Sequence, residues 1–153
     1  MSVKSATTRG LALPAQSKVV QIVFAQTGTE TSASTGTYVD TTLTATITPT
    51  SASNKILVFV THGANQKETN NTSVGMRLMR GATELARIML DGGKDGGTGR
   101  NDFGGTSLNW LDEPATTSAT TYKTQFASTG GNPIVWVQTA GSKSSITLME
   151  VTP

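Results

Sequence analysis

Residues 42–48 read TLTATIT, and this stretch decides the fold class. Leu43, Ala45 and Ile47 alternate with threonines, which is the period of two expected for a β-strand with one buried side. Threonine is β-branched and therefore suits the exposed side of a strand. The stretch predicts a strand that contributes one side to a hydrophobic core and presents a ladder of hydroxyl groups on the other.

Short runs of the same kind recur along the chain between turns rich in Gly, Pro, Asn and Ser. The run 55–63 is apolar at consecutive positions, so we expect a central strand that is covered on both sides. Residues 83–90 have helical propensity, but they follow a strand-like run across Gly81, and a hairpin strand is the more economical interpretation. The other predicted strands are 18–26, 74–80, 106–112, 121–128, 134–139 and 144–151.

Length and composition agree with a single β domain. A chain of 153 residues is long enough to bury one substantial core. It contains 28 Thr and 14 Ser against 14% charged residues, so its polarity comes from hydroxyl groups rather than ions. The strand pattern predicts an all-β fold, an antiparallel jelly-roll sandwich of about 8–10 strands. We expect this domain to cover residues 19–153.

Charge and residue usage exclude several classes of protein. The net charge is only +2, and Lys and Arg are spread along the chain, so nucleic-acid binding is not expected. Without cysteine, neither a disulfide framework nor a thiolate metal site can form. No run approaches the roughly 20 apolar residues that span a bilayer, and the N-terminus lacks the apolar segment of a signal peptide. We expect synthesis in a cytoplasm, no Sec export and no membrane insertion.

Residues 1–18 show neither strand nor helix periodicity, and Gly10 and Pro14 interrupt them. We interpret this segment as an extended arm outside the domain. Its apolar patch is typical of a peptide that docks on a partner, and consists of Leu11, Ala12, Leu13 and Pro14. A terminus without a binding role is the alternative interpretation.

Residues 91–105 read DGGKDGGTGRNDFGG, and their seven glycines raise the question of a ligand-binding loop. A phosphate-binding loop needs a hydroxyl residue after its lysine, but Asp95 follows Lys94. A dinucleotide fingerprint beginning at Gly97 needs glycine at the position of Asp102. Neither nucleotide motif is therefore present.

A calcium loop counted from Asp91 fails as well, because Gly93 stands at a position that must supply a ligand and no flanking helices are expected. We predict a flexible connection from a strand ending near Leu90 to one beginning near Thr106. Together with loop 63–73, it supplies the candidate surface-contact residues Asn65, Asn70, Asn71, Asp95, Arg100, Asn101 and Asp102.

No catalytic arrangement is visible in the sequence. His62 is the single histidine, so it forms no metal-binding pair and defines no catalytic triad by itself. Asp112 and Glu113 are adjacent on a strand and point to opposite sides, so they cannot flank one glycosidic bond. We expect no enzyme activity, no cofactor and no metal. The core or a subunit interface accounts for the aromatic residues Trp110, Tyr122, Phe126 and Trp136.

Three stretches, in this order, resemble the C-terminal jelly-roll domain of bacteriophage tail-fibre and related virion surface proteins. They are TYVDTTLTATITPTSASNKILVFV (37–60), RLMRGATEL (77–85) with LDEPATTSATTYKTQFA (111–127), and SSITLMEV (144–151). The resemblance covers most of residues 19–151. It implies a sandwich of the tumour-necrosis-factor or C1q kind that forms a homotrimer on the outside of a phage particle, and it carries over no catalytic residue.

We therefore expect a non-enzymatic virion structural protein, a trimeric knob on the particle exterior. Residues 1–18 would dock it to capsid or tail proteins, in a decoration or short-fibre role. The alternative is a receptor-binding module whose loops 63–73 and 91–105 hold host surface glycan. A capsular depolymerase has the least support, because no acid pair, metal cluster or nucleophile elbow is visible.

Overall fold

The computed structural model describes residues 18–94 and 101–153. The predicted arm residues 11–14, together with Asp95 and Arg100, lie outside these ranges. The described residues form twelve strands and one short 3-10 helix. In chain order these are β1 (Val19–Thr27), β2 (Thr31–Ala33), β3 (Val39–Ile47), β4 (Lys55–His62), β5 (Asn65–Lys67), β6 (Val74–Arg80), β7 (Thr83–Gly92), β8 (Asn101–Phe103), β9 (Thr106–Asp112), β10 (Thr120–Ser128), β11 (Val135–Val137), η1 (Thr139–Gly141) and β12 (Ser144–Val151).

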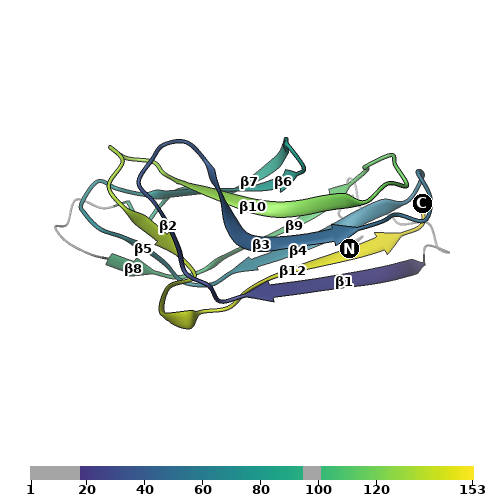
Figure 1. Cartoon of the computed structure of the whole chain (residues 1–153), viewed down its shortest axis with the longest axis horizontal. Helices are drawn as coiled ribbons and strands as arrows, with labels where there is room; N and C mark the ends of the chain where they lie inside the picture. The colour runs from purple at the N-terminus through teal and green to yellow at the C-terminus, as the bar shows by residue number, and fades with distance from the viewer. Residues whose placement is uncertain (1–17, 95–100) are drawn as a thin grey trace, which may run out of the picture.

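Two four-stranded antiparallel sheets pack face to face, which confirms the predicted all-β sandwich of the jelly-roll type (Figure 1). The β1 sheet has the order β1-β12-β4-β9, and the β3 sheet has the order β3-β10-β6-β7. A smaller sheet of order β2-β11-β5-β8, the end sheet, lies at the left end of the molecule in Figure 1. Successive strands of the chain therefore alternate repeatedly between layers.

The stretch 42–48 behaves as predicted. In β3, Leu43, Ala45 and Ile47 are buried, whereas the threonines between them are exposed. Residues 83–90 belong to strand β7, and Gly81 stands in the turn before it with a φ of +55°. The strand interpretation of this segment is confirmed.

Strand β4 lies between β12 and β9, as expected of a central strand. Its inner residues Ile56, Val58 and Val60 are buried in the core. Its outer residues Leu57 and Phe59 are only half-buried, so the expectation that both sides are covered is wrong for a single chain.

Two apolar clusters occupy the interior. The larger lies between the two main sheets and contains the fully buried Tyr122. The smaller contains Phe126 and is completed by residues of the end sheet, among them Val135 and Val137. Two of the four aromatic predictions, Tyr122 and Phe126, are thus core residues. Trp136 is half-buried in β11, and Trp110 is 36% exposed on the edge strand β9.

The predictions for 63–73 and 91–105 need correction, because both segments contribute strands to the end sheet. Strand β7 continues to Gly92, and β8 (Asn101–Phe103) pairs with β5. Asn65 lies in β5 and is fully buried, so it is not a surface-loop residue. Phe103 anchors β8 because it packs against the smaller apolar cluster. Strands of three residues are too short to show a clear alternation in the sequence.

Buried polar contacts join the two main sheets at one edge. Asp112, at the end of β9, accepts hydrogen bonds from Arg80 Nη1 at 2.8 and 2.9 Å and from the Tyr122 hydroxyl at 2.6 Å. Arg80 and Tyr122 belong to the β3 sheet, so one carboxylate of the β1 sheet binds two of its strands. Burial, followed by the contact with Asp112, raises the pKa of Tyr122.

A second buried carboxylate holds the loop after β3. Glu150 is fully buried in β12 and accepts hydrogen bonds from Asn54 Nδ2 at 2.6 Å and from Thr50 N at 2.7 Å. Burial alone would raise its pKa, but the hydrogen bonds from Asn54, Gln21 and Thr50 outweigh burial and lower it to about 2. Glu150 therefore stays ionised although no cation is among these donors.

The hydrogen bond between Tyr122 and Asp112 yields a paired test. Tyr122→Phe removes a donor from a buried carboxylate, and we expect it to lower the free energy of unfolding by about 1.5–3 kcal/mol. Tyr38→Phe removes a buried hydroxyl that has no hydrogen-bond partner among the described residues, so we expect a change within about 0.5 kcal/mol. Urea unfolding at one fixed protein concentration measures both values. Equal losses for the two variants would contradict this account.

Candidate assembly surface and buried polar groups

The outer side of the β1 sheet carries apolar side chains in two adjacent cross-strand rows. One row consists of Ile22, Met149, Leu57 and Leu111, and the next consists of Phe24, Thr147, Phe59 and Asn109. Directly paired residues of antiparallel strands lie on the same side of a sheet, so these side chains form one continuous surface. We call its six apolar members the apolar face: Ile22, Phe24, Leu57, Phe59, Leu111 and Met149.

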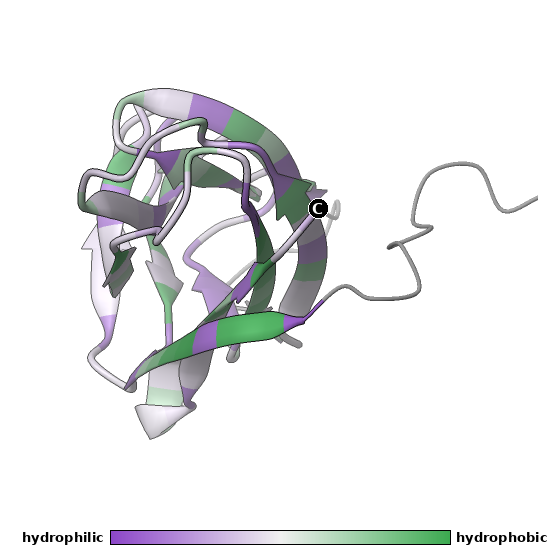
Figure 2. Cartoon of the chain, turned by 90° about the vertical axis from the view of Figure 1, so that its right-hand side faces the viewer, coloured by the Kyte–Doolittle hydropathy of each residue, from purple (hydrophilic) through white to green (hydrophobic). Residues whose placement is uncertain are grey.

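The apolar face is most open along β1. Ile22 and Phe24 are each 59% exposed, and the neighbouring Val20 is 41% exposed. In Figure 2, β1 is the mostly green strand that crosses the lower half of the molecule. Monomeric soluble proteins rarely expose contiguous apolar patches of this kind, and an edge strand that bears one is prone to association. The arrangement is typical of a surface that another molecule covers.

The corresponding outer side of the β3 sheet is mostly polar, although Leu90 of the edge strand β7 is 61% exposed. Thr44 and Thr46 of β3 lie beside β10, whose Lys123 pairs with Asp40 at 2.8 Å. Arg77 of β6 donates to Gln125 at 2.7 and 2.9 Å and to Glu84 at 2.7 Å. Of the two outer sides, the apolar one therefore belongs to the β1 sheet.

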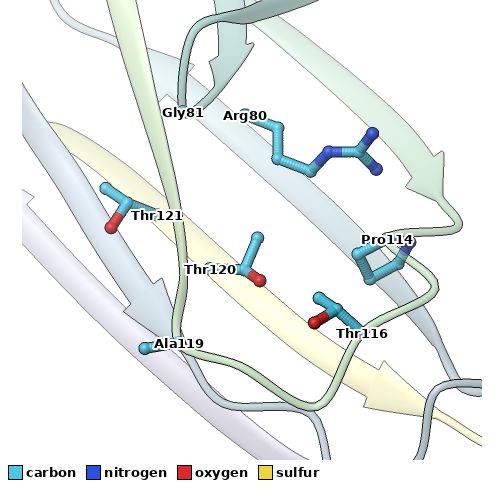
Figure 3. A pocket seen from close by; sticks show the side chains of 7 residues that line it. All are labelled: Arg80, Gly81, Pro114, Thr116, Ala119, Thr120 and Thr121. Carbon is cyan, nitrogen blue, oxygen red and sulfur yellow. The ribbon is translucent and has the colours of Figure 1, made fainter.

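A hollow of about 320 Å³ lies beside Arg80, and Figure 3 shows the guanidinium group extending toward Pro114. Its polar groups are engaged within the protein, since Arg80 pairs with Asp112 and the Thr120 hydroxyl donates to Ser118 O at 3.0 Å. The Thr121 hydroxyl likewise pairs with that of Thr46 at 2.8 Å. The cation in this hollow is thus already neutralised by a carboxylate.

His62 is buried between the two main sheets. Its Nε2 lies 2.8 Å from Thr124 Oγ1 on β10, and its Nδ1 lies 3.2 Å from Ser144 Oγ on β12. Thr124 in turn pairs with Thr41 at 2.7 Å. Burial lowers the pKa of His62 to about 4, so the ring is neutral at neutral pH.

The candidate surface residues within the described ranges do not form one cluster. Asn70 and Asn71 are exposed in the turn between β5 and β6, and Asn71 adopts a φ of 54°. Asp102 is exposed on β8 and accepts a hydrogen bond from Gln66 Nε2. The backbone of Asn101 belongs to the same strand, whereas Asn65 is buried. Sequence reasoning missed Gln66, because it lies in the polar tripeptide NQK, which we assigned to a loop.

Asp112 and Glu113 diverge as predicted. Asp112 is directed into the inter-sheet contact with Arg80, whereas Glu113 pairs with Lys55 at 2.6 Å and is exposed. Over residues 18–94 and 101–153, no group of three or more His, Asp or Glu side chains is placed to hold a metal ion. Within the same ranges, no helix is long and apolar enough to cross a membrane.

The burial of His62 makes stability depend on pH. The pKa is about 4 in the folded protein against an ordinary 6.5, so between these values the unfolded state binds a proton that the folded state does not. Stability therefore falls as the pH drops from 6.5 to 4, by about 3 kcal/mol from this residue. His62→Gln does not titrate, and we expect its free energy of unfolding to fall less over this interval by that amount. Parallel pH profiles from urea unfolding would contradict this assignment.

Comparisons with known proteins identify no family. No family model matches the sequence, and no curated protein matches it. Among solved structures, the chain is similar to one titled "Structure of infectious bursal disease virus Gx strain", with a TM-score of 0.49 and 12% sequence identity. The match covers 86% of this chain and 33% of that one, so this protein spans about one third of its length. A TM-score at this level does not establish a common fold, and the jelly-roll assignment follows from the strand order itself.

Proposed function

We propose that this protein is a non-enzymatic structural component of a bacteriophage particle. It assembles as a homotrimer through the apolar face, forms a knob on the particle exterior, and docks to capsid or tail proteins through residues 1–18. The observation that carries the proposal is the apolar face itself, which is open along β1, where Ile22 and Phe24 are each 59% exposed, and half-buried at its other four residues. The virion setting and the number of three subunits come from the resemblance to phage tail-fibre jelly-roll domains.

Symmetric assembly accounts for the contrast between the two outer surfaces. In a closed homo-oligomer every copy contributes the same surface, so a face that is apolar in one chain is covered in all of them. Contact along β1 also covers a sheet edge, where Ile22 and Phe24 are most exposed. The polar outer side of the β3 sheet stays in water, where its ion pairs and threonine hydroxyls are solvated. The jelly roll is a frequent architecture of viral capsid and lectin domains, which agrees with this setting.

The placement of the ionisable residues supports a role without catalysis. His62 is enclosed between Thr124 and Ser144. Asp112 is committed to Arg80 and Tyr122. Each of these groups serves the contact between the sheets, and a general acid or base must instead reach a substrate.

Receptor recognition is the second candidate function. The exposed turn with Asn70 and Asn71 and the exposed Asp102 supply polar groups of the kind that contact glycans. This function is compatible with trimeric assembly, because the turn lies outside the apolar face. Particle attachment and receptor binding could therefore reside in one protein.

The assembly proposal predicts the effect of a charge on the apolar face. We expect the wild type to sediment at three times the 15.9 kDa mass of one chain. Phe24→Asp would place a carboxylate in the contact and shift the protein to the monomer, with its circular dichroism preserved because Phe24 is largely exposed in the single chain. Analytical ultracentrifugation measures the mass.

Thr44→Asp is the matched control, since it adds the same charge to the exposed outer side of the β3 sheet. We expect this variant to stay trimeric. A monomeric wild type would refute assembly through the apolar face, and a dimer would refute the subunit number.

Docking through the arm is tested by removing residues 2–17. We expect the truncated protein to keep its mass in ultracentrifugation and to disappear from purified particles, as measured by immunoblotting and by immunogold imaging of the particle surface. Leu11→Asp with Leu13→Asp should have the same effect, because docking requires burial of the apolar patch. Normal incorporation of either variant would refute the docking role.

A further inference from the structure

Within the surface that carries the apolar face, one cross-strand row alternates between apolar and polar side chains. This row, which we call the mixed row, reads Phe24, Thr147, Phe59 and Asn109 from β1 to β9. The row on one side of it, which begins at Ile22, is apolar at all four positions. The row on its other side is polar at all four positions and consists of Gln26, Ser145, Thr61 and Ser107. The mixed row is therefore the border of the apolar face.

Thr147 has apolar neighbours in the mixed row and along its own strand. It lies on β12, an interior strand of the β1 sheet, and pairs directly with Phe24 and Phe59. Met149 follows it on the same side of β12. Thr147 is half-buried, and Asn109 on the edge strand β9 is exposed. Neither side chain makes a hydrogen bond with another residue in the part of the chain that the structure describes, so in a single chain water solvates both groups.

Assembly through the apolar face would remove this water from the mixed row. A buried hydroxyl or amide without a hydrogen-bond partner costs free energy. Where the apolar faces of several copies meet around one axis, each copy brings the same residues to the contact. The polar side chains of the mixed row are then again Thr147 and Asn109. A hydroxyl and a primary amide can each donate and accept, so these side chains can satisfy one another between copies.

The composition of the three rows limits how two such faces can be aligned. A shift by one strand, about 4.8 Å, keeps the all-apolar row in apolar contact and costs little there. In the mixed row the same shift exchanges aromatic and polar positions, so that the Thr147 hydroxyl lies against a phenyl ring. A shift by two residues along the strands, about 7 Å, brings the polar row over the all-apolar row. Alignment across the strands is therefore distinguished by the mixed row, because a hydroxyl without a partner disfavours the wrong one.

We propose that Thr147 and Asn109 are the specificity-determining residues of the assembly, and that their hydrogen bonds to the mixed rows of neighbouring copies select one alignment and one subunit number. This inference rests on the proposed function, which supplies a second copy as the occupant of the apolar face. Apolar contact provides the affinity, and the two polar groups exclude the other alignments. A single buried asparagine has the same role in coiled coils, where it fixes register and oligomeric state at a cost in stability.

The test replaces both polar groups by apolar ones of similar shape in the full-length protein. Thr147→Val with Asn109→Leu is compared with the wild type by native mass spectrometry and by sedimentation velocity over a concentration series. We expect the wild type to form one oligomer. The double variant should dissociate at no higher concentration, because replacing both partners of a hydrogen bond by apolar groups is neutral or stabilising. Its preference for one subunit number should fall below about tenfold, so that at least about one in ten assemblies has another number.

Thr83→Val with Asn70→Leu is the matched control, since it makes the same replacements at exposed positions outside the apolar face. It should keep the single oligomer of the wild type. A double variant with one subunit number, as in the wild type, overturns this inference and leaves assembly through the apolar face standing, whereas a monomeric wild type refutes both. The inference is also overturned if the double variant is monomeric where the wild type is assembled, or if the control is equally heterogeneous. Thr147→Val alone carries the same expectation if the double variant does not fold.

Discussion

The packing of the two sheets through their inner sides is the interaction on which the rest of the structure depends. Side chains alternate between the two sides of a strand. Each residue that points into this core therefore has chain neighbours that point to the outer side of the sheet. Leu43 and Ile47 of β3 pack with Val58 of β4 and Leu148 of β12, and their neighbours are free to differ. On the β3 sheet most of these neighbours are threonines and charged residues, whereas on the β1 sheet they include the six residues of the apolar face. The same core thus supports a polar outer side on the β3 sheet and the apolar face on the β1 sheet.

Buried polar groups refine this packing. Asp112 and His62 both extend from the β1 sheet to β10 of the β3 sheet, at Tyr122 and Thr124. Apolar contacts tolerate a sliding of one sheet over the other, whereas these hydrogen bonds are satisfied in one register only. His62 achieves this as a neutral ring, and Asp112 does so as a carboxylate with Arg80 beside it. Two polar contacts therefore fix the relative placement of layers that the hydrophobic effect merely brings together.

The sequence predicts the long strands well, because runs such as 42–48 repeat their alternation often enough to be read. It does not predict β5 and β8, whose three residues show no periodicity and whose pairing depends on partners distant in the chain. The same limit applies to the contact between Gln66 and Asp102. Asp102 was a candidate because it is polar and lies near glycines, but its neighbour Gln66 is 36 residues away in the chain. The sequence does not predict the apolar face for a related reason, because its two cross-strand rows combine residues of four strands.

The pairing of β1 with β12 has a consequence for the order in which the molecule forms. Among the described strands, β12 is the only ladder partner of β1, and Val19 pairs with Val151 at the far end of the chain. A growing polypeptide therefore carries β1 as an unpaired apolar strand until nearly the whole domain has been synthesised. Pairing between strands so distant in the sequence is slow, and it leaves unpaired apolar strand edges exposed until it occurs. Strand β1, which carries the most exposed residues of the apolar face, therefore pairs only after β12 has been synthesised. The apolar face is complete only when the fold is complete.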